Sequence, residues 1–213
     1  MQITPTPVIH LLHEAPHAIL STHSTQQPGY PYGTAVPLVV DEAQRPLLLI
    51  SALAEHTKNL LVDARASLAV VEPGCANVQD AARATLLGRV EPFEPTAGLV
   101  RRYLRYQPDA EQYLQLDFRF FRMQVERVRY IGGVGRMGWL DAAGWQSIDA
   151  LSEADEARLL AAAPACPGRL LLGVDALGID FAIDGERRRL RFPSTLASAD
   201  IAGQLAALPG STP

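Results

Sequence analysis

The sequence predicts a mainly β protein of the α+β class, with an antiparallel β-barrel, packed helices and a small C-terminal α-β-β-β-α unit. Strand-like segments follow one another as far as Ile131, and helices interrupt them between hairpins and not after every strand. A doubly wound parallel sheet would show regular alternation of strand and helix, which is absent. A change of composition near Gly144 then divides the chain into residues 1–145, the barrel, and residues 146–213.

The barrel segments can be assigned from periodicity and from turn residues. A helix pattern over 6–14 ends before Pro16. Alternating or continuous apolar runs predict strands over 18–23, 32–40, 47–51, 66–71, 83–93 and 117–131. Helical spacing appears around 53–61 and over 95–106, with a short helical piece through Tyr113 and Leu114. The Gly132–Gly135 stretch has the wrong spacing for a dinucleotide-binding turn.

The C-terminal unit has its own sequence of elements. An Ala-rich helix over 153–162 precedes strands over 169–174, 179–183 and 187–192, and a last helix runs over 197–208. A unit of about 60 residues buries too little surface to be comfortably stable alone. We therefore expect it to pack against the barrel.

The length, composition, net charge and cysteine content exclude several classes of protein. The chain has 213 residues, is 48% hydrophobic and 20% charged, and carries a formal net charge of −4. Nucleic-acid binding normally requires a basic face, which this composition does not provide. Cys75 and Cys166 stand far apart, which fits a reducing compartment and argues against a disulfide framework or zinc site. The first residues do not resemble a signal peptide, and no apolar run is long enough for a membrane span, so we expect a cytoplasmic protein.

One segment combines residues that suit a phosphate group. The stretch from Leu49 to Leu60 passes from a strand into a helix and carries His56, Thr57, Lys58 and Asn59 at that junction. Phosphates are bound where several donors converge, preferably at a helix N-terminus whose free N–H groups and dipole favour an anion. Taken alone, the same residues would also make an ordinary solvated first turn.

This segment, with Asp63–Leu68 after it, resembles the pyridoxamine 5'-phosphate oxidase-like FMN-binding split-barrel family. It is most similar to the haem-utilisation branch, in which a His-Thr-(Lys/Arg)-Asn-Leu segment occupies this place. The strand from Arg83 to Gly88, and Asp117-Phe118 followed by the glycine stretch, fit the same branch. The similarity covers roughly residues 5–140 in the same order, and the C-terminal unit resembles the small domain often fused to such barrels.

The resemblance implies FMN as cofactor, bound at the interface of a homodimer, with the flavin carrying any redox chemistry. It places a basic phosphate ligand at His56, with Lys58 and Asn59 close by and Thr57 in the same segment, and implies that Ser51 and Ala52 lie near the ribityl chain. It assigns the following residues to the strand that lines the isoalloxazine: Tyr32, Gly33, Thr34, Ala35 and Val36. Arg83 matches a polar position that reaches the flavin, commonly from the neighbouring subunit. No catalytic acid or base is implied.

Other functions remain open at this point. Haem binding or breakdown is the main alternative, but residues 151–158 lack the histidine cluster that such relatives carry, and no histidine follows His56. That leaves the following histidines as candidate iron ligands: His10, His13, His17 and His23. A metal site formed by the first three is not expected, because Pro16 breaks their helix and no carboxylate or cysteine completes the set. A deazaflavin cofactor, or a flavin-binding dimer without catalysis, is also compatible with the sequence.

Overall fold

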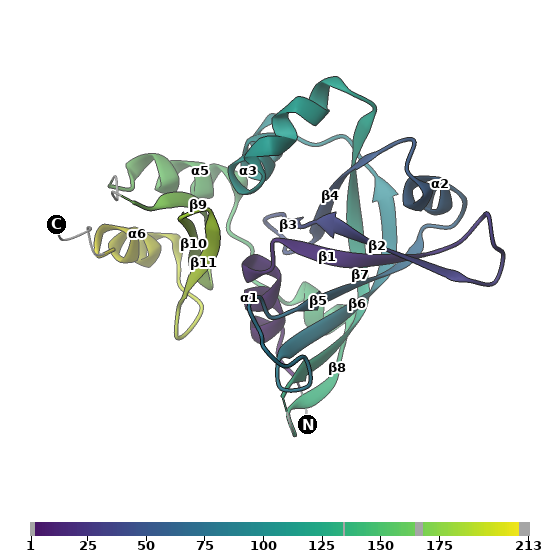
Figure 1. Cartoon of the computed structure of the whole chain (residues 1–213). Coiled ribbons are helices and arrows are strands. Elements are labelled where there is room, and N and C mark those ends of the chain that lie inside the picture. Colours follow the sequence, from purple (N-terminus) through teal and green to yellow (C-terminus); the bar gives the residue numbers. More distant parts are fainter. Residues whose placement is uncertain (1–2, 134, 165–167, 209–213) are drawn as a thin grey trace.

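The chain folds into a large curled antiparallel sheet with a small three-stranded sheet beside it (Figure 1). The computed structural model describes residues 3–133, 135–164 and 168–208. Cys166 and Val134 therefore lie outside the described residues, whereas Cys75 is a free thiol. Within the described ranges, no helix is both long and apolar enough to cross a membrane.

The large sheet has eight strands in the order β2-β1-β5-β6-β7-β4-β3, with β8 added to β7. Its strands are β1 (His17–His23), β2 (Pro31–Pro37), β3 (Val39–Val40), β4 (Pro46–Ser51), β5 (Arg65–Val71), β6 (Ala82–Pro92), β7 (Phe118–Gly132) and β8 (Met137–Asp141). The helices of this part are α1 (Thr6–Glu14), α2 (Glu55–Val62), α3 (Ala97–Tyr106), α4 (Ala142–Gln146) and the 3₁₀ helix η1 (Pro108–Gln115). Every strand pair in it is antiparallel, as the sequence predicts.

The long strand β7 organises the barrel. One of its edges pairs with β6, and the other pairs with β4 near Phe118 and with β8 near Ile131. Both of its faces are buried: Phe121 is 1% exposed inside the barrel core, while Phe120 packs with Tyr103 of α3 outside it. This two-sided burial explains why apolar residues occur at both alternating positions of the strand.

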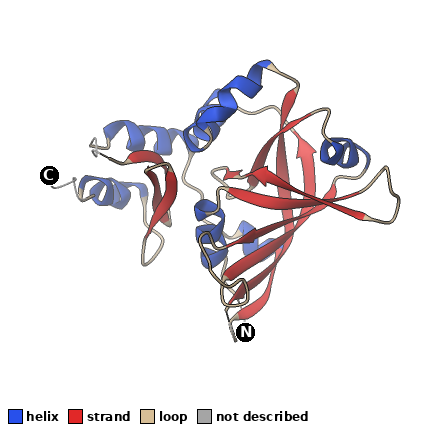
Figure 2. Cartoon of the chain, viewed as in Figure 1, coloured by secondary structure: helices blue, strands red, loops and turns tan. Residues whose placement is uncertain are grey.

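The C-terminal unit follows the predicted order. It consists of α5 (Glu153–Ala162), β9 (Leu170–Asp175), β10 (Gly178–Ile183), β11 (Glu186–Arg191) and α6 (Ser198–Ala206). Figure 2 shows α5 and α6 together against one face of its sheet. Ile179 and Ile201 are both 0% exposed in the apolar core between them.

The helix α1 lies between the barrel and the C-terminal unit (Figure 1). Its residues Val8, Ile9 and Leu12 are buried in the barrel core, while His10 and His13 bond with residues of the C-terminal sheet. The helix α1 therefore contributes both to the barrel core and to the contact with the second unit.

The structure corrects three details of the predicted elements. The strand predicted over 32–40 breaks at Leu38, whose N–H bonds to the Pro16 carbonyl and leaves the ladder. Strand β8 and helix α4 were not predicted, because they are short and follow a glycine-rich stretch for which no element was predicted. That stretch reverses the chain, and the Gly132 N–H bonds to the Arg136 carbonyl. The division proposed at residue 145 falls inside α4, whose Trp145 is buried in the barrel core.

Candidate functional site

The strand β4 ends in a tightly bonded turn that fixes the start of α2. The Ser51 hydroxyl donates to Asp117 (2.8 Å) and accepts from the N–H of Leu53 (3.1 Å). The Ser51 carbonyl accepts from the N–H of Ala54 and from the Thr57 hydroxyl, at 3.2 and 2.6 Å. Ser51 and Thr57 thus hold the turn together, so the direction of the first turn of α2 is set by the sheet.

The first turn of α2 keeps unused hydrogen-bonding groups. Its N-cap is Ala54, which has no side chain able to cap, and the N–H groups of Glu55 and His56 have no hydrogen-bond partner among the described residues. Two buried side-chain atoms in the same turn, Glu55 Oε1 and His56 Nε2, also have no partner among the described residues. Burial lowers the pKa of His56 below its usual 6.5, so the ring is neutral at pH 7. Lys58, one turn further, is exposed.

The Asn59 side chain is buried and forms hydrogen bonds within the fold. It is 0% exposed, and its amide nitrogen donates to the Thr22 hydroxyl (3.0 Å). Its amide oxygen accepts from both the N–H and the hydroxyl of Thr25, each at 2.9 Å. Asn59 therefore ties α2 to the end of β1, and neither of the threonines it contacts could be identified from local sequence.

The strand β2 presents its predicted residues on two faces. Val36 is buried, Tyr32 and Thr34 are half-buried on the same inner face, and Gly33 and Ala35 lie exposed on the outer face. Since α2 packs against β1 and β2, the inner-face residues belong to the same region as the first turn of α2. Ala52 joins this region through its N–H bond to the Asp117 carbonyl.

Arg83 lies away from the rest of this group within one chain. It pairs with Val71, whereas α2 leads into Arg65 at the other end of β5. Six residues of strand correspond to about 20 Å. The Arg83 guanidinium donates to the carbonyls of Val78, Gln79 and Ala81 and so holds the loop before β6.

The outer face of the sheet carries small and apolar residues in register. Ile19, 45% exposed, stands between Ala35 on β2 and Ala69 on β5. Further along this face Leu87 is 37% exposed and Trp139 is 46% exposed. A shallow hollow of about 350 Å³ crosses this face between β1 and β7. The face is mixed, because Leu87 pairs with Ser67 and Arg127, and Arg127 and Arg129 lie over the Trp139 ring. Its exposed apolar residues are of the kind that a protein–protein contact covers.

The histidines divide into two groups. His10 accepts from Arg189, and His13 lies between Asp175 and Asp180, so both contribute to the contact with the C-terminal unit. His17 and His23 are exposed and His56 is half-buried. The described residues contain no cluster of three His, Cys, Asp or Glu side chains suited to a metal ion.

Comparison with known proteins agrees with this architecture. The chain is 36% identical over 118 residues to "Non-canonical heme oxygenase HOZ, chloroplastic" from Arabidopsis thaliana, and it spans 36% of that protein's length and 54% of its own. A solved protein of unknown function from Agrobacterium tumefaciens aligns over 95% of this chain and 94% of its own, with 25% identity and a TM-score of 0.74.

Two further structures share the fold at lower identity. A heme binding protein from Mycobacterium smegmatis covers 96% of this chain and 98% of its own, at 23% identity and a TM-score of 0.64. A protein of the pyridoxinephosphate oxidase family from Clostridium acetobutylicum covers 65% of this chain and 94% of its own, at 14% identity and a TM-score of 0.51. The predicted split-barrel fold is therefore confirmed.

The family comparison concerns the barrel itself. The family model described as "CREG, beta-barrel" matches residues 9–147. This match runs from α1 to the residue after α4 and takes in all eight strands of the large sheet. The chain therefore belongs to the CREG β-barrel family.

Proposed function

We propose that this chain is an FMN-binding homodimer whose first turn of α2 receives the flavin phosphate. The observation that carries the proposal is this turn, in which the N–H groups of Glu55 and His56 have no partner among the described residues and which is followed at once by the exposed Lys58. Free N–H groups at a helix start and one cation are a common combination for binding phosphate. The neutral His56 ring adds a further donor if its buried Nε2 carries the proton.

Glu55 limits where the phosphate lies. Its buried Oε1 has no partner among the described residues, and two anions in contact would repel. We therefore assign the phosphate to the backbone N–H groups and Lys58. Thr57 and Asn59 act as positioning residues, since their polar atoms already hold the turn and the end of β1.

The dimer accounts for the separation of Arg83 from α2. Within one chain the two lie at opposite ends of β5, as described above. If the outer face of the sheet packs on a second copy, Arg83 of one protomer approaches the α2 region of its partner. Tyr32 and Thr34, half-buried on the inner face, then line the isoalloxazine, and Ser51 and Ala52 lie along the ribityl chain. Val36 is 3% exposed in the barrel core, so we assign it to the core and not to the flavin. Gly33 and Ala35, on the outer face of the same strand, leave room for close contact with the partner.

The chain offers an unusually direct test, because Lys58 is its only lysine. Reductive methylation with ¹³C-formaldehyde keeps the charge and labels Lys58 and the terminal amine alone. We expect FMN to shift the Lys58 signal and to leave the terminal signal in place. A flavin that binds without moving the Lys58 signal would contradict the proposed phosphate site.

Variants test the same site without labelling. Lys58→Ala should weaken FMN binding about tenfold or more, as expected for the loss of one charge-assisted bond. Arg158→Ala is the control, because Arg158 is exposed on α5, away from α2 and from the outer face of the large sheet, and pairs with Asp155. Equal affinity of Lys58→Ala and Arg158→Ala for FMN would count against the assignment.

Haem binding is a second candidate, favoured by the 36% identity to the chloroplast heme oxygenase. His10 accepts a hydrogen bond from Arg189, and His13 is paired with Asp180. The candidate iron ligands are therefore His17, His23 and His56. Titration with haemin should then give a Soret band that one of the variants His17→Ala, His23→Ala or His56→Ala shifts. One set of spectra with FMN and with haemin separates the two candidates.

A further inference from the structure

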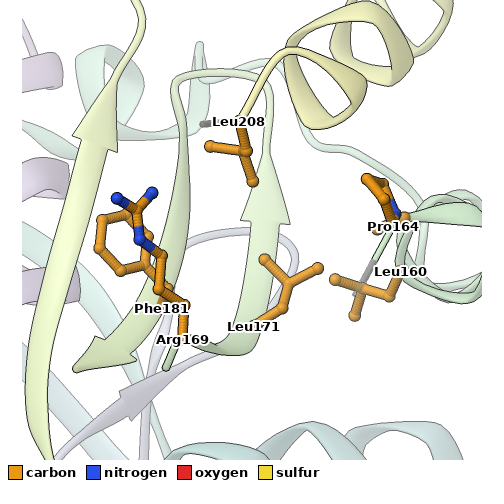
Figure 3. A pocket seen from close by; sticks show the side chains of 7 residues that line it. Leu160, Pro164, Arg169, Leu171, Phe181 and Leu208 are labelled. Carbon is orange, nitrogen blue, oxygen red and sulfur yellow. The ribbon is translucent and has the colours of Figure 1, made fainter. Parts of the chain in front are cut away.

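The C-terminal unit contains a hollow of about 260 Å³ at the open end of its core (Figure 3). Leu160, next to the end of α5, and Leu208, beyond α6, face it together with Leu171 of β9 and Phe181 of β10. All four side chains are half-buried, so the core between the helices and the sheet stays open here. The hollow lies in the part of the molecule far from α2 (Figure 1) and is separate from the flavin region.

A single cation stands at the rim of this apolar hollow. The Arg169 guanidinium carbon lies 5.6 Å from the centre of the Phe181 ring (Figure 3). The Arg169 side chain forms no ion pair or hydrogen bond with another described residue. A half-buried guanidinium without a carboxylate is uncommon, because its five donors fit an anion well.

A second, more polar hollow of about 410 Å³ continues from the first and shares Arg169 and Phe181 with it. It adds Arg188, which stands directly opposite Phe181 on β11. Arg188 makes one long bond, 3.5 Å, to the Arg187 carbonyl, and no acidic partner of it is recorded among the described residues.

The other charges of the second hollow are already bonded. Arg189 pairs with Asp175 and Asp180, and Glu14 pairs with Arg191. Glu72 accepts from the N–H of Ala82. Arg187 donates to the carbonyls of Ala15, Leu38 and Tyr106, so its donors are also occupied. Glu72 keeps its negative charge, and the cations whose donors remain for an anion are Arg169 and Arg188.

We propose that this paired hollow binds a small aliphatic carboxylate, with the hydrocarbon chain among Leu160, Leu171 and Leu208 and the carboxylate on Arg169. The walls favour an aliphatic chain, because they are mainly leucine side chains and the one ring among them, Phe181, already lies near the Arg169 guanidinium. A planar guanidinium binds a carboxylate through two parallel bonds. Ligand pockets usually measure roughly 300–1,000 Å³, so the apolar hollow selects a short to medium chain.

Calorimetric titration of the full chain with octanoate tests the proposal, with FMN present so that the flavin region is occupied. We expect one octanoate per chain, and much weaker binding of octan-1-ol, which has the same chain without the charge. Arg169→Leu keeps most of the volume and should reduce octanoate affinity about ten- to a hundredfold. The control Arg158→Leu removes an exposed arginine of α5 that pairs with Asp155, and it should bind octanoate as the unmodified chain does.

Two further variants keep the test decisive. Ala163→Phe fills the apolar hollow without a change of charge and should abolish binding. Arg169→Lys keeps the charge, loses the planar fork and should bind with intermediate affinity. Thermal unfolding by circular dichroism verifies that each variant is folded. The proposal is overturned if octanoate does not bind, if octan-1-ol binds equally well, or if folded Arg169→Leu retains full affinity.

Discussion

At the scale of single residues, His13 stands out because both of its ring nitrogens face acceptors. Nδ1 bonds to Asp180, while Nε2 lies 2.7 Å from Gln44 Oε1 and 3.0 Å from Asp175 Oδ2. Gln44 Nε2 donates to Asp175, so its Oε1 must accept from His13. Two donors are available only in the protonated ring, and His13 is therefore an imidazolium in the folded chain.

The charge balance around His13 explains this protonation. Burial and the neighbouring Arg189 act to lower its pKa, but Asp180 and Asp175 outweigh them and raise the pKa above its usual 6.5. Arg189 and His13 in turn lower the pKa of both carboxyls, against the effect of burial. Tyr106 donates to Asp180 from α3, so this buried cluster links the barrel to the C-terminal sheet.

The raised pKa of His13 predicts a loss of stability at alkaline pH. Its contribution is complete below the usual pKa of 6.5 and disappears as pH rises through the raised pKa of the folded chain. We expect the free energy of unfolding, measured with urea, to fall across this interval. The variant His13→Gln should lose this step, and an unchanged slope in it would contradict the assignment.

His10 and His56 change stability in the opposite direction. Burial lowers the pKa of His10 to about 4, helped by Arg189, and lowers that of His56. Their contributions are present above 6.5 and decrease as pH falls below it, since only the unfolded chain then takes up the protons. The alkaline interval therefore separates the effect of His13 from the effects of His10 and His56.

At the scale of elements, the bulge between β6 and β7 shapes the sheet. The register shifts between Leu87 and Gly88, so that Glu126 on β7 has no opposite residue. A Cβ atom at Gly88 would lie 2.0 Å from the Gln124 carbonyl oxygen, which is backbone and cannot move aside. The close approach of two strands at the bulge therefore requires glycine.

Gly88→Ala should destabilise the fold by about 1–3 kcal/mol, the usual cost of forcing atoms into a packed region. Gly203→Ala in α6 is the matched control, because nothing lies within 4 Å of its added Cβ. That control should be neutral or stabilising by up to about 1 kcal/mol, since alanine favours helix. Equal unfolding midpoints in urea for the two variants would contradict the role of the bulge.

At the scale of the whole molecule, the outer face of the sheet predicts the oligomeric state. Leu87→Asp places a charge at the centre of the proposed contact and should convert a dimer to a monomer, with loss of FMN affinity. The mass is measured by light scattering after size-exclusion chromatography. Leu116→Asp is the control, because Leu116 is 60% exposed after η1, outside this face. A chain that is monomeric before substitution would contradict the proposed dimer.

The architecture could largely be predicted, because local sequence patterns specify most of its strands and helices. Apolar periodicity and turn residues placed the principal strands and helices, and the order of the five C-terminal elements was right. The two short elements after Gly132 were missed, since each has only five residues, too few for a periodic pattern, and a glycine-rich turn precedes them. The junction between β4 and α2 could be predicted as a segment. The hydrogen bond from Asn59 to Thr22 could not, because Thr22 lies 37 residues away in the chain.

The sequence by itself determined the fold class and the junction of strand and helix between Ser51 and Asn59, because strand and helix periods are local properties of a chain. Only the tertiary structure decided which donors remain free and which charges are buried. His13 illustrates the difference: its partner Asp180 lies 167 residues away in the chain. Spacing along α1 cannot reveal that partner, because the contact forms only when the C-terminal sheet packs against the helix.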